Sequence, residues 1–180
     1  MKTRFPIKKL TTAAMLLALG MVLPTLMHGI GVGSVMLPMH IPVLLCGLLL
    51  GTPWGAAIGF LLPYLSSFTG MPPLFPTAVT MSFELCAYGA FTGLFYRRLR
   101  WNIYPSLLLS MLIGRGISGL ANAVLLGAAG SVYTFEAFLT GSFVTGLPGI
   151  IVQIALIPVL VLLLEKSRLF AKPARKVHAA

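Results

Sequence analysis

Long runs of apolar residues dominate the chain, and short segments rich in glycine, proline or basic residues interrupt them. A helix that crosses a bilayer needs about 20 mostly apolar residues. On this scale the pattern predicts six membrane-spanning helices: Lys9–Met27, Met36–Leu50, Trp54–Phe68, Thr77–Tyr96, Tyr104–Leu126 and Leu139–Leu164. The second and third are short, and only "GTPWG" separates them, so they form either a tight hairpin or two tilted, partly re-entrant helices. We expect an all-α membrane protein in which residues 1–180 form a single six-helix domain.

The composition supports a location in the membrane. Hydrophobic residues make up 58% of the chain and charged residues only 9%, and the mean hydropathy is +0.98. Soluble domains usually carry about 25% charged residues, so this chain lacks the charges to cover a surface that faces water. The two cysteines, Cys46 and Cys86, lie in apolar runs at no metal-binding or disulfide spacing, and we interpret them as small buried hydrophobes. The sequence predicts no metal site and no cofactor.

The basic residues set the expected orientation, because cytoplasmic flanks of membrane helices are enriched in Lys and Arg. Twelve of the 13 Lys and Arg precede the first span, follow the fourth or follow the sixth. The opposite loops, Gly29–Val35, Ser67–Pro76 and Gly127–Phe138, contain neither. Six spans with both termini in the cytoplasm satisfy this distribution. Attraction to anionic lipid accounts for the net charge of +10, so no nucleic-acid partner is needed.

Two charged residues lie well inside the predicted spans. Insertion of a charge near the bilayer centre costs roughly 2.5–3.5 kcal/mol. At 1.5 Å per residue, Glu84 lies about 11 Å and Arg115 about 17 Å from the outer ends of their antiparallel helices, so the two can form a pair. Two readings stay open: the pair fixes the register of the helices, or it lines a polar cavity for a solute.

Other polar side chains gather in the outer halves of the spans. They include His40, Tyr88 (one turn from Glu84), Asn122, Thr140, Ser142 and Thr145, with Gln153 placed deeper and with His28, Tyr133 and Glu136 in the outer loops. Together they predict an outward-facing cavity with hydrogen-bonding groups and aromatic surface. For any one of them, ordinary hydrogen bonding between helices is an equally good explanation. The proline-rich "GMPPLFP" predicts a stiff outer loop, since proline fixes φ and restricts the residue before it.

Small residues recur at four-residue spacing, which lets helix backbones approach closely in lipid. The positions are Ala14 and Ala18; Gly47, Gly51, Gly55 and Gly59; and Gly89 and Gly93. Most of these predict internal packing.

Motifs that would supply chemistry or energy are absent from the sequence. It contains no G-x-x-x-x-G-K-[ST] phosphate loop and no H-E-x-x-H, and the two halves show no repeat of the kind found in secondary transporters. We therefore expect a protein that is not an enzyme.

The chain resembles the substrate-binding S component of an energy-coupling-factor vitamin importer. The resemblance rests on six short spans in about 180 residues, a basic N-terminus, and three stretches: "AMLLA", "MLPMHIPVLLCGLLLG" and "GMPPLFPTAVTMSFELCAYGAFTGLFYRRL". It implies capture of a vitamin or vitamin precursor from outside a bacterial cytoplasmic membrane. It also implies docking, through the first helix, onto a membrane coupling subunit that two cytoplasmic ATPases drive.

The resemblance also assigns residues to roles. Ala14 and Ala18 would face the coupling subunit, and Glu84, Arg115 and Asn122 would lie near the ligand. With the polar residues above, the candidate substrate-binding set is Glu84, Arg115, Asn122, His40, Tyr88 and Gln153. A nicotinate-like compound and a cobalamin-precursor nucleoside are the two candidate substrates. The alternative is a self-sufficient channel or a membrane enzyme, which would be active without partners.

Overall fold

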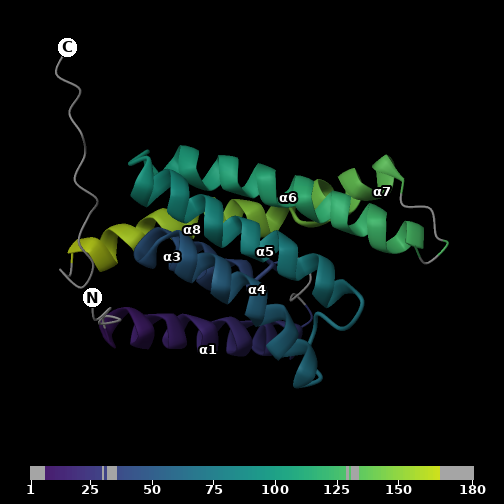
Figure 1. The fold of residues 1–180 in the computed structure, drawn as a ribbon, viewed down its shortest axis with the longest axis horizontal. Helices are drawn as coiled ribbons and strands as arrows, with labels where there is room; N and C mark the ends of the chain where they lie inside the picture. Colours follow the sequence, from purple (N-terminus) through teal and green to yellow (C-terminus); the bar gives the residue numbers. More distant parts are fainter. Residues whose placement is uncertain (1–6, 30, 32–35, 129, 131–133, 167–180) are drawn as a thin grey trace, which may run out of the picture.

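The computed structural model describes residues 7–29, 31, 36–128, 130 and 134–166, and within these ranges it contains helices and short connections but no strand (Figure 1). The α-helices are α1 (Ile7–Gly29), α3 (His40–Leu50), α4 (Thr52–Phe68), α5 (Thr77–Gly93), α6 (Ile103–Ala128), α7 (Phe135–Leu139) and α8 (Leu147–Lys166). Two π-helical segments, η1 (Leu94–Arg98) and η2 (Thr140–Thr145), follow α5 and α7. The prediction of an all-helical protein is confirmed for the described part of the chain.

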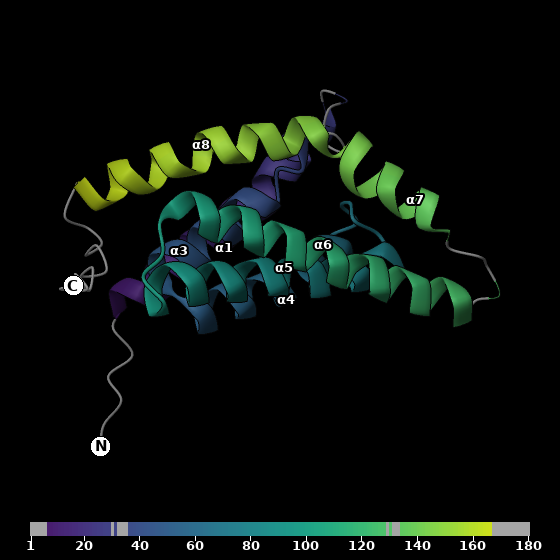
Figure 2. The same cartoon turned by 90° about the horizontal axis from the view of Figure 1, so that it is seen from above.

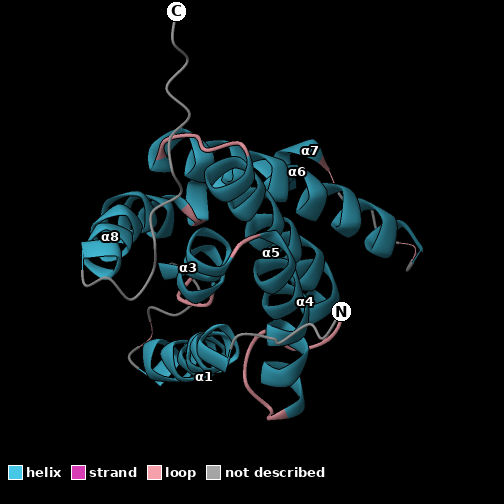
Figure 3. Ribbon diagram, turned by 60° about the vertical axis from the view of Figure 1, so that its left-hand side comes forward, coloured by secondary structure: helices cyan, strands magenta, loops and turns pink. Residues whose placement is uncertain are grey.

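Helix α3 is the innermost element. It packs against α1, α4, α5 and α8, and Figure 3 shows it between α1, α5 and α8. Of its 11 residues, every one except Ile41 is buried. A helix that is apolar on all sides is expected in such a position, and α3 supplies much of the hydrophobic core, including Val43, Leu44 and Leu48.

Four helical segments are long and apolar enough to cross a membrane: Ile7–Gly29, Thr77–Arg98, Ile103–Ala128 and Leu147–Lys166. Helix α3 rises only about 17 Å at 1.5 Å per residue, which is less than the roughly 30 Å of a hydrocarbon core. The start of α1, the start of α6 and the end of α8 lie at the same end of the molecule (Figure 1), as the distribution of basic residues requires. The count of six spans, the cytoplasmic termini and the single domain stay predictions.

The bounds of two predicted spans differ from those of the observed helices by more than three residues. The second was expected to begin at Met36, but α3 begins at His40. The residue before a proline avoids the α-helical region, and Leu37, which precedes Pro38, has a φ of 48°. The connection therefore turns here and enters the helix only after Pro38.

The last predicted span, Leu139–Leu164, is interrupted rather than continuous. The chain passes from α7 through η2 and starts α8 at Leu147. Pro148 has no N–H, so it cannot donate a backbone hydrogen bond to the preceding helical segment. Figure 2 shows the bend between α7 and α8, with α7 turned toward the far end of α6. The Phe138 ring lies against Gly119 at this place.

The connection between α4 and α5 is fastened to the end of α4. The Ser66 hydroxyl donates to the Pro72 carbonyl at 2.8 Å, and the Met71 N–H donates to the Ser66 carbonyl at 3.0 Å. Ser66 itself is buried. These bonds agree with the prediction of a stiff outer loop at "GMPPLFP".

At the opposite end, side-chain bonds join three helices. The Tyr96 hydroxyl donates to Glu165 of α8 at 2.8 Å, and Nε of Arg97 donates to the Leu48 carbonyl near the end of α3 at 2.8 Å. A cation that bonds the last carbonyls of a helix favours its C-terminal dipole. Through Tyr96 and Arg97, the segment η1 that continues α5 is thus bonded to the ends of α3 and α8.

Backbone contact through glycine joins α5 to the hairpin of α3 and α4. We call this contact the glycine seam, and its members are Gly47, Gly55, Gly59, Gly89 and Gly93. A Cβ at any of these positions would lie within 3.0 Å of backbone atoms across the seam, such as the Gly89 carbonyl for Gly47 and Gly55. Only glycine fits there, and the prediction that these residues serve internal packing is confirmed.

Replacement of Gly89 by alanine tests the seam. The added methyl would meet the Gly55 backbone, which cannot yield as a side chain can, so we expect Gly89→Ala to destabilise the protein by about 1–3 kcal/mol. The measurement is the unfolding midpoint of the purified protein. Gly127→Ala is the matched control, because a Cβ at Gly127 meets nothing within 4 Å and alanine favours helix by up to about 1 kcal/mol. Equal unfolding midpoints for the two variants would contradict the role of the glycine seam in stability.

Candidate functional site

Buried polar side chains lie inside the bundle on four of its helices. We call this group the polar cluster: His40 at the start of α3, Glu84 and Tyr88 on α5, Arg115 on α6 and Gln153 on α8. All five are buried, with exposures between 0% and 8%. Four of the six residues that the sequence predicted for substrate binding, namely His40, Glu84, Tyr88 and Arg115, interact with one another. A fifth, Gln153, is buried on α8 and reaches the Leu37 carbonyl just before α3.

The carboxylate of Glu84 is the centre of the cluster. Tyr88 follows it by one helical turn, and its hydroxyl donates to Glu84 Oε1 at 3.0 Å. From α3, Nε2 of His40 approaches the same oxygen at 3.6 Å. The His40 ring also lies against the Tyr88 ring, with centroids 5.2 Å apart. The register of α3 against α5 therefore sets the geometry around this carboxylate.

Arg115 supplies the opposite charge. It interacts electrostatically with Glu84 and with Tyr88, and Ser118, one turn further along α6, lies beside the carboxylate. Gly114 lets α6 approach, because a Cβ there would overlap the Tyr88 ring. The expected proximity of Glu84 and Arg115 is confirmed, and it explains how a charge can be held in this apolar surrounding.

Several buried polar atoms of the cluster have no hydrogen-bond partner within the described residues. They include Nδ1 of His40 and Oε1 of Gln153, whereas Nε2 of His40 faces the Glu84 carboxylate. The Gln153 amide reaches the Leu37 carbonyl with Nε2 at 3.5 Å. A buried polar atom without a partner costs about 1–3 kcal/mol, so these atoms are available to a bound molecule.

None of the other described polar residues predicted from the sequence is buried. Asn122 is half-buried and donates to the Ser118 carbonyl of its own helix at 3.0 Å. Thr140, Thr145 and Glu136 are exposed. Tyr133 and the side chain of Ser142 lie outside the described residues.

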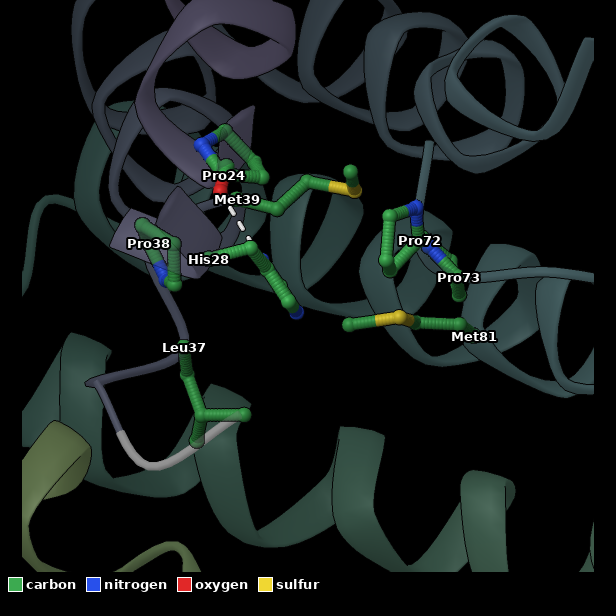
Figure 4. Close-up of a pocket in the computed structure, with 8 residues that line it drawn as sticks. All are labelled: Pro24, His28, Leu37, Pro38, Met39, Pro72, Pro73 and Met81. Carbon is green, nitrogen blue, oxygen red and sulfur yellow. Dashed lines mark hydrogen bonds between the residues drawn. The ribbon is translucent and has the colours of Figure 1, made fainter. Parts of the chain in front are cut away.

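A cavity of about 170 Å³ lies between α1, the connection before α3 and the "GMPPLFP" loop (Figure 4). We call it the outer cavity. Its lining residues include four prolines (Pro24, Pro38, Pro72 and Pro73) and two methionines, Met39 and Met81. Met39 precedes His40 in the chain, and Met81 lies one turn before Glu84 on α5, so the outer cavity and the polar cluster share the same two elements.

His28 is the polar residue among those that line the outer cavity. Its Nδ1 makes a 2.8 Å hydrogen bond with the Pro24 carbonyl one turn earlier in α1. Figure 4 shows the ring extending from this bond into the space between Leu37 and Met81. The sequence analysis placed His28 in the outer loops, whereas the structure places it in the last turn of α1.

Sequence reasoning missed Met39, Met81 and Gly114. Of the two methionines, only Met81 could have been placed on the face of Glu84 from its spacing, since residues three apart on a helix share a face. Its place in the cavity wall depends on contacts with other segments. Gly114 carried no such signal, because its role depends on the Tyr88 ring of another helix.

Ala14 and Ala18 face outward. The inner face of α1 is formed by Ala13, Leu16, Gly20 and Pro24, and the two alanines lie on the exposed side. They are therefore accessible to another protein within the membrane.

The described residues contain no group of three or more His, Cys, Asp or Glu side chains that could hold a metal ion. The polar cluster instead combines one carboxylate, one guanidinium, an imidazole and an amide. Such a set can hydrogen-bond both the donors and the acceptors of an organic molecule.

A family model described as "ECF transporter, substrate-specific component" matches residues 8–161. No curated protein and no solved structure matches the chain. The matched range covers the polar cluster, the outer cavity and both exposed alanines of α1.

Proposed function

The chain belongs to the family of ECF transporter substrate-specific components, and from this premise we propose that it captures a vitamin or vitamin precursor from outside the cell for ATP-driven import. The family places it in a transporter of the membrane, and four long apolar helices agree with a multi-pass membrane protein. The finer assignments, namely the kind of solute, the partners and a bacterial cytoplasmic membrane, are part of the proposal.

The unpartnered polar atoms of the cluster carry this proposal. A purely structural ion pair would be stabilised by satisfying the polar groups around it. Yet Nδ1 of His40 and Oε1 of Gln153 are buried without a hydrogen-bond partner among the described residues. A solute that bonds these atoms removes their cost. Its binding is then driven by the same polar groups that are unfavourable without it.

The cluster favours a flat molecule with polar edges. Glu84 accepts hydrogen bonds, Arg115 donates them, and Gln153 can do both. His40 and Tyr88 add aromatic surface on which a ring can pack. Both candidate substrates, a nicotinate-like compound and a cobalamin-precursor nucleoside, contain such a ring.

The energy for import would come from partner subunits. The sequence has no phosphate-binding loop, so we propose that a membrane coupling subunit and two cytoplasmic ATPases drive the transport. The exposed face of α1 at Ala14 and Ala18 would receive the coupling subunit, because small residues allow close helix contact in lipid.

Mass spectrometry of small molecules released from the purified protein tests the proposed capture. Protein from cells grown in rich medium should release one ring-containing solute at about one molecule per chain. We expect Glu84→Gln to reduce the retained amount by at least about tenfold, since the loss of a charged hydrogen bond costs roughly 1.5–3 kcal/mol. The free energy of unfolding of this variant, measured without solute, should fall by less than its free energy of solute binding.

Glu136→Gln is the matched control, because it makes the same chemical change at an exposed carboxylate of α7. This variant should retain the solute fully. A steep fall in the stability of Glu84→Gln with unchanged retention would mean that the carboxylate is structural. Transport by the purified chain alone in liposomes would contradict the role as a subunit.

Enlargement of the two exposed alanines tests the coupling face. We expect Ala14→Leu with Ala18→Leu to abolish uptake of the retained solute in cells, because the bulkier side chains keep the coupling helix away. Retention by the purified variant should be unchanged. Val124→Phe, at an exposed position of α6, enlarges a residue away from this face and should leave uptake intact. Loss of retention, or normal uptake, in the α1 variant would refute the assignment.

A further inference from the structure

The outer cavity differs chemically from the polar cluster beside it. No charged residue is among the described residues that line it. These residues are prolines, methionines and a leucine, with His28 as the polar member. Such walls disfavour a charged group, because burial of a charge without a partner is costly. The cavity and the cluster therefore suit different parts of a molecule, or different molecules.

The size of the cavity limits its occupant. An apolar cavity of about 150 Å³ holds benzene, and the outer cavity measures about 170 Å³. This volume fits one small ring system. Rigid proline rings and adaptable methionine side chains provide flat and adjustable apolar surface for it.

The hydrogen bond of His28 determines what its other nitrogen offers. The Pro24 carbonyl can only accept, so Nδ1 of His28 donates in the 2.8 Å bond. In the neutral imidazole Nε2 is then an acceptor. The ring extends into the cavity from that bond (Figure 4). Nε2 is therefore a side-chain acceptor among the otherwise apolar side chains of the described lining residues.

We propose that the outer cavity is a binding subsite for a small uncharged ring that donates one hydrogen bond to Nε2 of His28. The inference rests on the proposed function. The subsite would hold either the part of the captured solute that lies outside the polar cluster, or a whole solute before it reaches the cluster. His28 would determine specificity by favouring rings with an N–H or O–H donor over equally large rings without one.

Two isomeric probes test this subsite. 3-Methylindole and 1-methylindole have the same atoms, but only the first has an N–H donor. Binding to the full chain in nanodiscs is measured by equilibrium dialysis, with empty nanodiscs to subtract partition into lipid. We expect 3-methylindole to bind about five- to tenfold more tightly, as one net hydrogen bond predicts.

His28→Phe keeps a ring at the cavity but removes the acceptor, so it should abolish the preference between the isomers. Thr25→Val is the control: Thr25 is exposed on the same helix, its hydroxyl bonds only the Met21 carbonyl among the described contacts, and it does not line the cavity. This variant should keep the preference.

Equal binding of the isomers to the wild type, a preference that survives His28→Phe, or no binding of either probe would overturn the subsite. Each of these results leaves the retention of a solute by the polar cluster unaffected. Conversely, a protein that retains no solute but distinguishes the isomers would refute the proposed capture while supporting the subsite.

Discussion

The close backbone contact along the glycine seam is the constraint on which the rest of the structure depends. Gly47, Gly55 and Gly89 have no side chain to separate α5 from the hairpin of α3 and α4. In lipid, where the hydrophobic effect does not drive helices together, such contact is a principal source of association. It places the short helix α3 in the centre of the bundle, although α3 is only 11 residues long.

The polar cluster follows from this arrangement. With α3 held against α5, the first residue of α3 brings its imidazole to the Glu84 carboxylate, and Gly114 lets α6 bring Arg115 to the same place. The charge inside an apolar segment is thereby compensated, yet neighbouring polar atoms lack partners in the described structure. We interpret this incomplete satisfaction as the physical basis of solute capture, and the apolar outer cavity as the adjoining part of the site.

Much of this could be predicted from the sequence, for identifiable reasons. The cost of a charge in hydrocarbon singles out Glu84 and Arg115, and four-residue spacing singles out the seam glycines. The interruption of the last helix at η2 was missed because the apolar run continues across it. The role of Gly114 and the wall formed by Met39 and Met81 depend on contacts between distant segments, which periodicity does not encode. Asn122 was predicted to join the site, but its amide bonds its own helix, and its role in binding stays a prediction.

We propose that the captured solute binds at the polar cluster, and the position of the retained solute decides whether it does. The measurement is an experimental structure of the protein purified with that solute. We predict electron density for the ring of the solute against His40 and Tyr88. Polar atoms of the solute should lie within hydrogen-bond distance of a His40 nitrogen and of Gln153 Oε1. A solute bound elsewhere, with those atoms bonded to water or protein instead, would contradict it.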